Sequence, residues 1–99
     1  PDPRAEFIVG ERPIPVLRRA GDVIWFHFDA LCRGPRAVAD YIEIARSFHS
    51  VLLSGVPRLD ETLEDEARRF VHLVDEFYDR RVKLFVAAAS APETLYQGW

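Results

Sequence analysis

The segment between Glu61 and Arg81 constrains the fold of this chain most, because it contains neither glycine nor proline. Apolar residues recur in it three or four positions apart, as on one face of an α-helix. They are Leu63, Ala67, Phe70, Val71, Val74, Phe77 and Tyr78. Pairs of opposite charge four residues apart (Glu64–Arg68, Asp65–Arg69 and Glu76–Arg80) add about 0.2–0.5 kcal/mol each to a helix. The segment therefore predicts a long amphipathic helix, with Thr62 and Asp65 as a capping box.

A helix here decides how the acidic pair Asp75-Glu76 is interpreted. The string "FVHLVDEF" is similar to the end of a buried strand in nucleotide hydrolases, where one carboxylate holds magnesium and the next orients water. On a helix, adjacent side chains diverge by about 100°, so the two carboxylates cannot share such a site. The phosphate-binding pattern G-x-x-x-x-G-K-[ST] is also absent from the sequence. The chain is therefore predicted to contain no catalytic and no nucleotide-binding residues, and Asp75 is expected on a polar face or at an interface.

The rest of the chain alternates between strand and helix patterns. Pro35 suits the first turn of a helix, and Val38, Tyr41, Ile42, Ala45 and Phe48 share one face of it. Ser90, Pro92 and Glu93 predict the start of another helix that includes Thr94, Leu95 and Tyr96. Strands are predicted at residues 7–9, 14–18, 23–28, 50–57 and 82–89.

These elements predict an α/β fold with a small mixed sheet. N-terminal antiparallel strands are followed by β-α-β-α-β with parallel strands and a C-terminal helix start. Right-handed crossovers make the last three strands parallel neighbours. Pro13 and Pro15 place the second strand at a sheet edge. The apolar runs Val51–Leu53 and Leu84–Ala88 predict that both faces of the sheet are covered.

Composition limits the class of protein. Ninety-nine residues form a single domain, 1–99, and a net charge of −3 does not suggest nucleic acid as a partner. Cys32 is the only cysteine, so no internal disulfide forms, as expected in the reducing cytoplasm. The chain begins at Pro1 and contains no methionine, which suggests a piece of a longer protein.

Few residues are spaced as metal ligands or as a catalytic nucleophile and its base. His27, His49 and His72 share no metal-ligand spacing with Cys32, so no metal site is predicted. A Cys32–His49 nucleophile pair requires that folding bring the two together, and Cys32 is expected instead to be a small packing residue. Tyr41 is expected to anchor the core with its hydroxyl at the rim.

The basic pair Arg68-Arg69 is the remaining candidate, because arginine recognises phosphates and carboxylates of neighbouring domains. The predicted interface residues are therefore Arg68, Arg69 and Asp75.

Four strings carry a family resemblance: "FDALCRGP", "DYIEIARSFHSVLLSGVP", "EARRFVHLVDEFYDRRVKLFVAA" and "LYQG". From about Arg12 to Gly98 the chain resembles the C-terminal part of the ZapE-type AAA-family ATPases, which are bacterial cell-division ATPases with mitochondrial relatives. The resemblance implies that ATP and Mg²⁺ bind to an ATPase core upstream of this chain. It also implies a cytoplasmic protein, peripheral to the inner membrane, that forms oligomers through the longer protein and has FtsZ or a membrane protein as client.

Two departures from the family pattern stand out. Members commonly have Ser-Asp-Val-Pro where this chain has Ser54-Gly55-Val56-Pro57, and Ser-Ala-Glu where it has Ala87-Ala88-Ala89. If those polar residues contact nucleotide or a neighbouring subunit in relatives, that contact is missing or altered in this chain. Three hypotheses follow. The chain is an accessory domain that docks on the ATPase core or a neighbouring subunit, a free-standing interaction module that recruits FtsZ or a membrane client, or an independent nucleotide-binding or phosphoryl-transfer domain.

Overall fold

The computed structural model describes residues 6–9 and 12–89. The predicted helix start at 90–96 lies outside the described residues. In chain order the elements are β1 (Glu6–Val9), β2 (Arg12–Pro15), β3 (Arg18–Ala20), β4 (Val23–His27), α1 (Phe28–Cys32), α2 (Val38–Ser47), β5 (Ser50–Val56), a 3₁₀ turn (Glu61–Leu63), α3 (Glu64–Asp79) and β6 (Lys83–Ala88).

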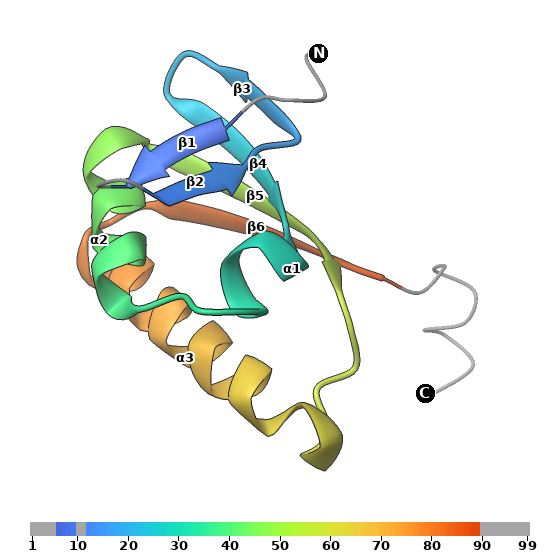
Figure 1. The fold of residues 1–99 in the computed structure, drawn as a ribbon. Coiled ribbons are helices and arrows are strands. Elements are labelled where there is room, and N and C mark those ends of the chain that lie inside the picture. The colour runs from blue at the N-terminus through green and yellow to red at the C-terminus, as the bar shows by residue number, and fades with distance from the viewer. Residues whose placement is uncertain (1–5, 10–11, 90–99) are drawn as a thin grey trace.

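Strands β3 to β6 form one sheet in the order β3-β4-β5-β6 (Figure 1). β3 runs antiparallel to β4, whereas β4, β5 and β6 are parallel. β1 and β2 form a separate antiparallel pair, so Pro13 and Pro15 lie on a strand with only one neighbour. The predicted fold class, the parallel arrangement of the last three strands and the edge position of the prolines are therefore confirmed.

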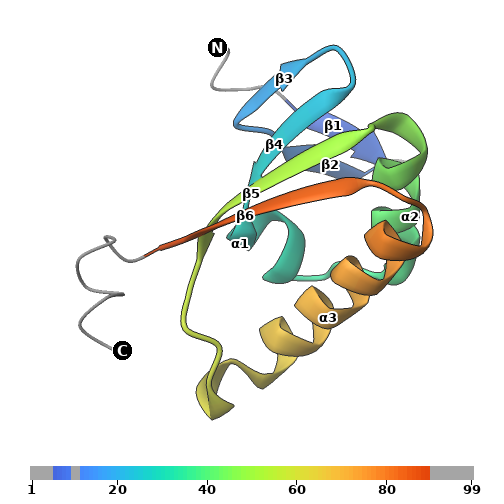
Figure 2. The same cartoon turned by 180° about the vertical axis from the view of Figure 1, so that it is seen from behind.

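The core lies between one face of the sheet and the helices. Ile24, Phe26, Val51 and Leu53 on β4 and β5 are buried and belong to one cluster with α1, α2, α3 and the β1-β2 hairpin. Helices α1 and α3 lie below the strands in both Figure 1 and Figure 2. All three helices therefore contribute to one layer, because both crossovers of the parallel strands pass on the same side.

The long helix is confirmed, and its buried face is the predicted one in part, because Phe70 and Val74 pack against the core. Leu73 and Phe77 are buried, whereas Val71 and Tyr78 are 56% and 82% exposed. Apolar residues cover more of this helix than its contacts with α1 and α2 require, so spacing alone could not identify the centre of the buried face. The predicted Thr62–Asp65 capping box is wrong. Asp60 caps the preceding 3₁₀ turn, and its Oδ1 accepts from the Thr62 N–H at 2.9 Å.

The connection from β4 to β5 contains two helices where the sequence predicted one at 34–50. Strand β4 ends at His27, because the His27 ring accepts a hydrogen bond from the Asp29 N–H (3.0 Å) and caps α1. Pro35 precedes α2, which begins only at Val38. The start is fixed by Asp40, whose Oδ2 accepts from the Ala37 N–H at 2.8 Å. Val38, predicted on the buried face, is 37% exposed.

Cover on both faces of the sheet was predicted and is not found within the described residues. Phe85 is 56% exposed and Trp25 is 37% exposed, on the face opposite to the helices. Every residue of β6 except Leu84 is exposed.

None of the helices within residues 6–9 and 12–89 combines the length and apolar character needed to cross a bilayer.

Candidate interaction surfaces

The outer surface of α3 carries two of the three predicted interface residues, Arg68 and Asp75, both exposed. The Arg68 guanidinium pairs with Asp65 three residues earlier, at 3.3 Å, instead of with Glu64. With side chains 62% and 70% exposed, such a pair contributes at most about 1 kcal/mol. Val71 lies between Arg68 and Asp75 on the same stripe. Arg68, Val71 and Asp75, here called the α3 surface, are thus accessible to another protein.

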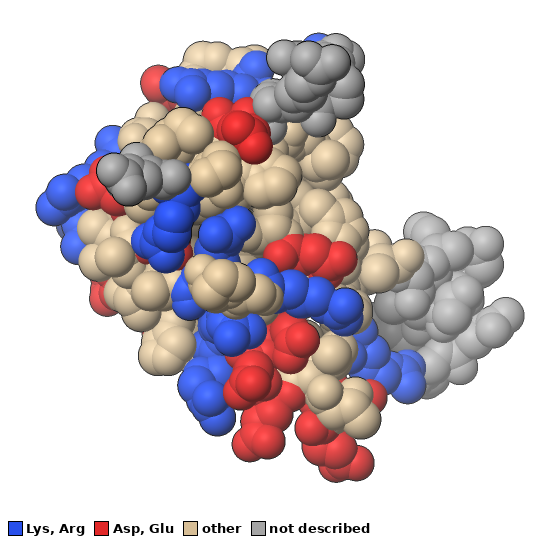
Figure 3. Space-filling view, viewed as in Figure 1, with Lys and Arg blue, Asp and Glu red and all other residues tan. Residues whose placement is uncertain are grey.

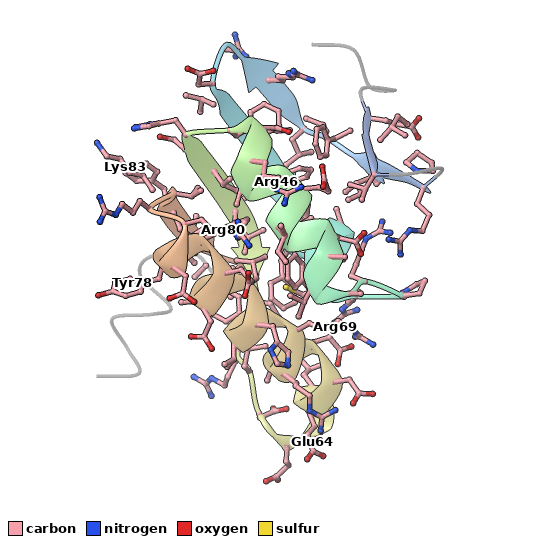
Figure 4. The ribbon with its side chains drawn as sticks, turned by 90° about the vertical axis from the view of Figure 1, so that its left-hand side faces the viewer. Arg46, Glu64, Arg69, Tyr78, Arg80 and Lys83 are labelled. Carbon is pink, nitrogen blue, oxygen red and sulfur yellow. The ribbon has the colours of Figure 1, made fainter. Side chains whose placement is uncertain are left out.

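Arg69 has a different environment from its neighbour. Its Nη1 donates to the backbone carbonyl oxygen of Cys32 at 3.1 Å, at the end of α1. A cation beside the terminal carbonyl groups of a helix is favourable. Arg69 therefore connects α3 to α1 within the domain, and Figure 4 shows its position on the helix.

The acidic pair lies on α3, which confirms the helical interpretation. Asp75 is exposed, whereas Glu76 is partly buried, with its Oε1 3.4 Å from Arg80 Nε. The two carboxylates therefore have different surroundings. Among the described residues, no three His, Cys, Asp or Glu side chains come together in a way that could hold a metal ion.

Cys32 is a packing residue, as predicted. It is fully buried, and burial raises the pKa of its thiol from 9.0 to about 12, although nearby Arg69 lowers it in part. Little reactive thiolate forms at neutral pH. His49 precedes the amino end of β5, whereas Cys32 follows the carboxyl end of the parallel strand β4. The two residues lie at opposite ends of the sheet and cannot form a nucleophile pair.

Tyr41 anchors the core, but its hydroxyl does not lie at the rim. The side chain is 1% exposed, and the hydroxyl donates to the Leu31 carbonyl oxygen at 2.7 Å. Burial raises the pKa of Tyr41 above its usual value of 10.0. The hydroxyl therefore serves as a buried link between α2 and α1.

The carboxyl edge of the parallel strands, where open α/β sheets bind ligands, is occupied by His27. Gly55 at the end of β5 has φ +72°, and a Cβ atom there would lie 2.2 Å from His27 Nε2. An aspartate at position 55, common in the family that the sequence resembles, would require the imidazole to move. Nearby, Trp25 Nε1 donates to Ser54 Oγ at 2.8 Å. This chain therefore has glycine where family members commonly have aspartate, and the His27 imidazole fills the space beside Gly55.

The uncovered face of the sheet is apolar. Trp25, Leu52 and Phe85 are aligned across β4, β5 and β6, and Val23 lies beside them on the same side of β4. We call these four residues the sheet face. It holds a shallow hollow of about 160 Å³ next to Trp25, Leu52 and Phe85, which Leu53, Ser54, Val86 and Ala87 also line. Side chains alternate between the two faces along a strand, so "VIWFH" and "VLL" show which residues share a face. They do not show whether that face is covered.

Charge on the view in Figure 3 is mixed, with Lys and Arg interspersed among Asp and Glu. Acidic atoms gather at the lower end, where α3 begins with Glu64, Asp65 and Glu66.

Comparison with known proteins identifies a family and several relatives that cover most of the chain. Residues 1–99 match the family model described as AFG1-like ATPase. The cell division protein ZapE of Escherichia coli (strain K12) is 41% identical over 90 residues, which are 91% of this chain and 24% of that protein. Lactation elevated protein 1 homolog B of Danio rerio is 41% identical over 81 residues, or 82% of this chain and 16% of that protein. The chain therefore spans a quarter or less of the length of these relatives. No solved structure matches it.

Proposed function

The chain belongs to the AFG1-like ATPase family, and from this premise we propose that it is a non-catalytic, C-terminal accessory domain of a longer ATPase. ATP and Mg²⁺ would bind in a core outside residues 1–99. The domain would dock on that core or on a neighbouring subunit and couple ATP hydrolysis to a protein client in cell division.

The helical position of the acidic pair is the observation that carries this proposal. Family likeness extends over residues 1–99, yet the sequence contains no phosphate-binding loop. Its pair most similar to a magnesium-binding motif, Asp75-Glu76, is held on α3 with carboxylates that diverge by about 100°. Calorimetry with ATP and Mg²⁺ on residues 1–99 is expected to give no binding heat. Saturable binding would contradict the proposal.

The α3 surface is our candidate contact with a neighbouring subunit or client, such as FtsZ or a protein at the inner membrane of the bacterial cytoplasm. It offers a cation (Arg68), an apolar side chain (Val71) and an anion (Asp75) along one exposed stripe. Arg69 would act indirectly, because it positions α3 against α1.

Arg46 provides a matched control for Arg68. Both arginines pair with an acid three residues earlier at 3.3 Å, and their side chains are 64% and 62% exposed. In the full-length protein, Arg68→Ala is expected to reduce client-stimulated ATP hydrolysis or to shift the oligomer size, whereas Arg46→Ala leaves both unchanged. If the two variants behave alike, the α3 surface is not the contact.

A free-standing interaction module is the second candidate. Tyr78 projects from the end of α3 (Figure 4) and is 82% exposed, as expected of an aromatic contact residue. Under this alternative, residues 1–99 alone would retain purified FtsZ or vesicles carrying a membrane client, and Tyr78→Ala would abolish retention. Retention only by the full-length protein would favour the accessory role.

A further inference from the structure

We infer that the sheet face is where the rest of the same polypeptide packs, and that the segment covering it is an amphipathic helix with acidic residues beside its apolar stripe. This inference rests on the proposed function, because it requires that the chain be part of a longer ATPase. It assigns the sheet face (Val23, Trp25, Leu52 and Phe85) to contacts within one polypeptide and leaves the α3 surface to other proteins.

The first argument is the type of sheet. Three of the four strands, β4, β5 and β6, are parallel, and strands of parallel sheets are typically buried on both faces. Here the described residues cover one face. On the other, Val23, Trp25 and Phe85 are 40%, 37% and 56% exposed beside an almost wholly apolar hollow. A contiguous apolar surface of this kind marks a contact region.

The second argument is the difference between the two edges of the sheet. Edge strands of soluble proteins are commonly short or charged, which prevents unwanted pairing. β3 fits this description, with three exposed residues of which two are arginines. β6 does not, because five apolar residues follow Lys83 and Val86 is 49% exposed. The sheet therefore has a protected edge at β3 and, at β6, an edge suited to further cover.

The third argument identifies the charge of the covering segment. The four strands of the sheet contain no Asp or Glu, but they contain Arg18, Arg19 and Lys83. Arg18 is paired with Trp25 across β3 and β4, so it lies on the same side as the sheet face. Lys83 lies on that side of β6, two residues before Phe85. A helix with acidic residues beside its apolar stripe would complement both cations.

The same charges argue against a second copy as the occupant. In a two-fold dimer each patch meets its own equivalent, so Arg18 and Lys83 would face the like charges of the other copy. In contrast, the longer polypeptide offers ample covering material, because this chain is 24% of the length of the E. coli relative. The rest of the polypeptide is therefore the better occupant.

Cysteine labelling of the full-length protein tests the inference. Phe85, Val71 and Ile8 are each 56% exposed in this chain, on the sheet face, the α3 surface and β1 respectively. Phe85→Cys, Val71→Cys and Ile8→Cys are treated with a maleimide, and each rate is divided by its rate in denaturant. Labelled peptides are quantified by mass spectrometry, and the fully buried native Cys32 serves as an unreactive internal reference.

We expect monomeric full-length Phe85→Cys to react at least about tenfold more slowly than Ile8→Cys, because a covered thiol reacts only when the contact opens. Rates within twofold of each other would overturn the inference. Ala87→Cys, also beside the hollow, must show the same protection, and it guards against undocking caused by loss of the Phe85 ring. Protection that appears only when the protein dimerises would assign the face to a second copy and would also overturn the inference.

Two further outcomes separate this inference from the proposed function. Slow labelling at Val71 with fast labelling at Phe85 would leave docking intact but reject the sheet face as its site. Labelling does not depend on ATP hydrolysis. Slow labelling of Phe85→Cys in a full-length protein without ATPase activity would therefore reject the proposed function alone.

A charge reversal tests the acidic character of the covering segment. Arg18→Glu is expected to accelerate labelling at Phe85→Cys severalfold, whereas Arg46→Glu does not. Equal effects would reject the acidic character of the occupant.

Discussion

The ion pair between the buried Asp40 on α2 and the half-exposed Arg12 on β2 leads to an asymmetric prediction. The Asp40 side chain is 0% exposed, whereas the Arg12 side chain is 50% exposed. Arg12 Nη2 donates to Asp40 Oδ1, and the Ala37 N–H donates to Oδ2 at 2.8 Å. Removing the arginine leaves a buried carboxylate with one remaining partner, whereas removing the carboxylate leaves a guanidinium that can turn to water.

The two substitutions should therefore have unequal costs. Loss of one partner of a buried pair costs about 3–5 kcal/mol, and because Asp40 keeps its bond to Ala37 we expect Arg12→Met to cost about 3 kcal/mol. Asp40→Asn keeps an acceptor for the Ala37 N–H and should cost about 1–2 kcal/mol. The double variant should cost less than the sum, since the two residues are in contact.

Urea denaturation of the chain measures these free energies of unfolding. Arg68→Met is the control, because it breaks an exposed pair worth at most about 1 kcal/mol. If Asp40→Asn costs as much as Arg12→Met or more, burial of the carboxylate does not determine the energetics and the reasoning is refuted.

Three further predictions concern single residues of the core and of the carboxyl edge. Gly55→Ala should destabilise by at least about 1–2 kcal/mol because φ is positive, and His27→Ala in addition should recover only the part due to the Cβ contact at 2.2 Å. Full recovery in thermal denaturation would contradict backbone strain. The pKa of Cys32 is raised from 9.0 to about 12, so the folded state favours the protonated thiol. Its contribution to stability is complete below pH 9.0 and is lost as the pH rises through that interval. Stability measured against pH should therefore fall more steeply than in Cys32→Ala, and parallel curves would refute this. Tyr41→Phe leaves the buried Leu31 carbonyl oxygen without its donor and should cost about 1–2 kcal/mol in urea, whereas a cost near zero would show that water replaces the hydroxyl.

Local patterns predicted the type and order of the main elements. The segment without Gly or Pro gave α3, and the apolar runs gave β5 and β6 with their parallel neighbours. Boundaries determined by single hydrogen bonds were missed. Nothing in the residues around His27 indicates that its ring will accept from the Asp29 N–H and end β4 there. Pro35 suited a helix start, but Asp40 fixed the start three residues later.

Contacts between segments far apart in the chain could not be predicted from the sequence either. Arg69 was predicted to pair with Asp65 four residues before it, yet its guanidinium reaches a carbonyl group 37 residues away. The pair between Arg12 and Asp40 spans 28 residues. A side chain with a plausible local partner therefore gives no sign that tertiary packing provides another one. This is why Arg68 and Arg69, which look equivalent in the sequence, have different roles in the structure.

The cover predicted for both faces of the sheet is the most informative disagreement. Trp25, Leu52 and Phe85 are residues of the kind found inside a protein, but in this chain they meet solvent on the side opposite to the helices. Burying one such side chain contributes about 1.5–3 kcal/mol, so a sequence that keeps three in a row on an uncovered face is adapted to surroundings that the described residues do not supply. Strand composition reflects the environment in which a strand functions, whereas the described residues supply cover for only one face of the sheet. If the labelling experiment finds Phe85 protected in the full-length protein, the composition was correct about the complete molecule and the open face is the boundary at which this domain meets the rest of it.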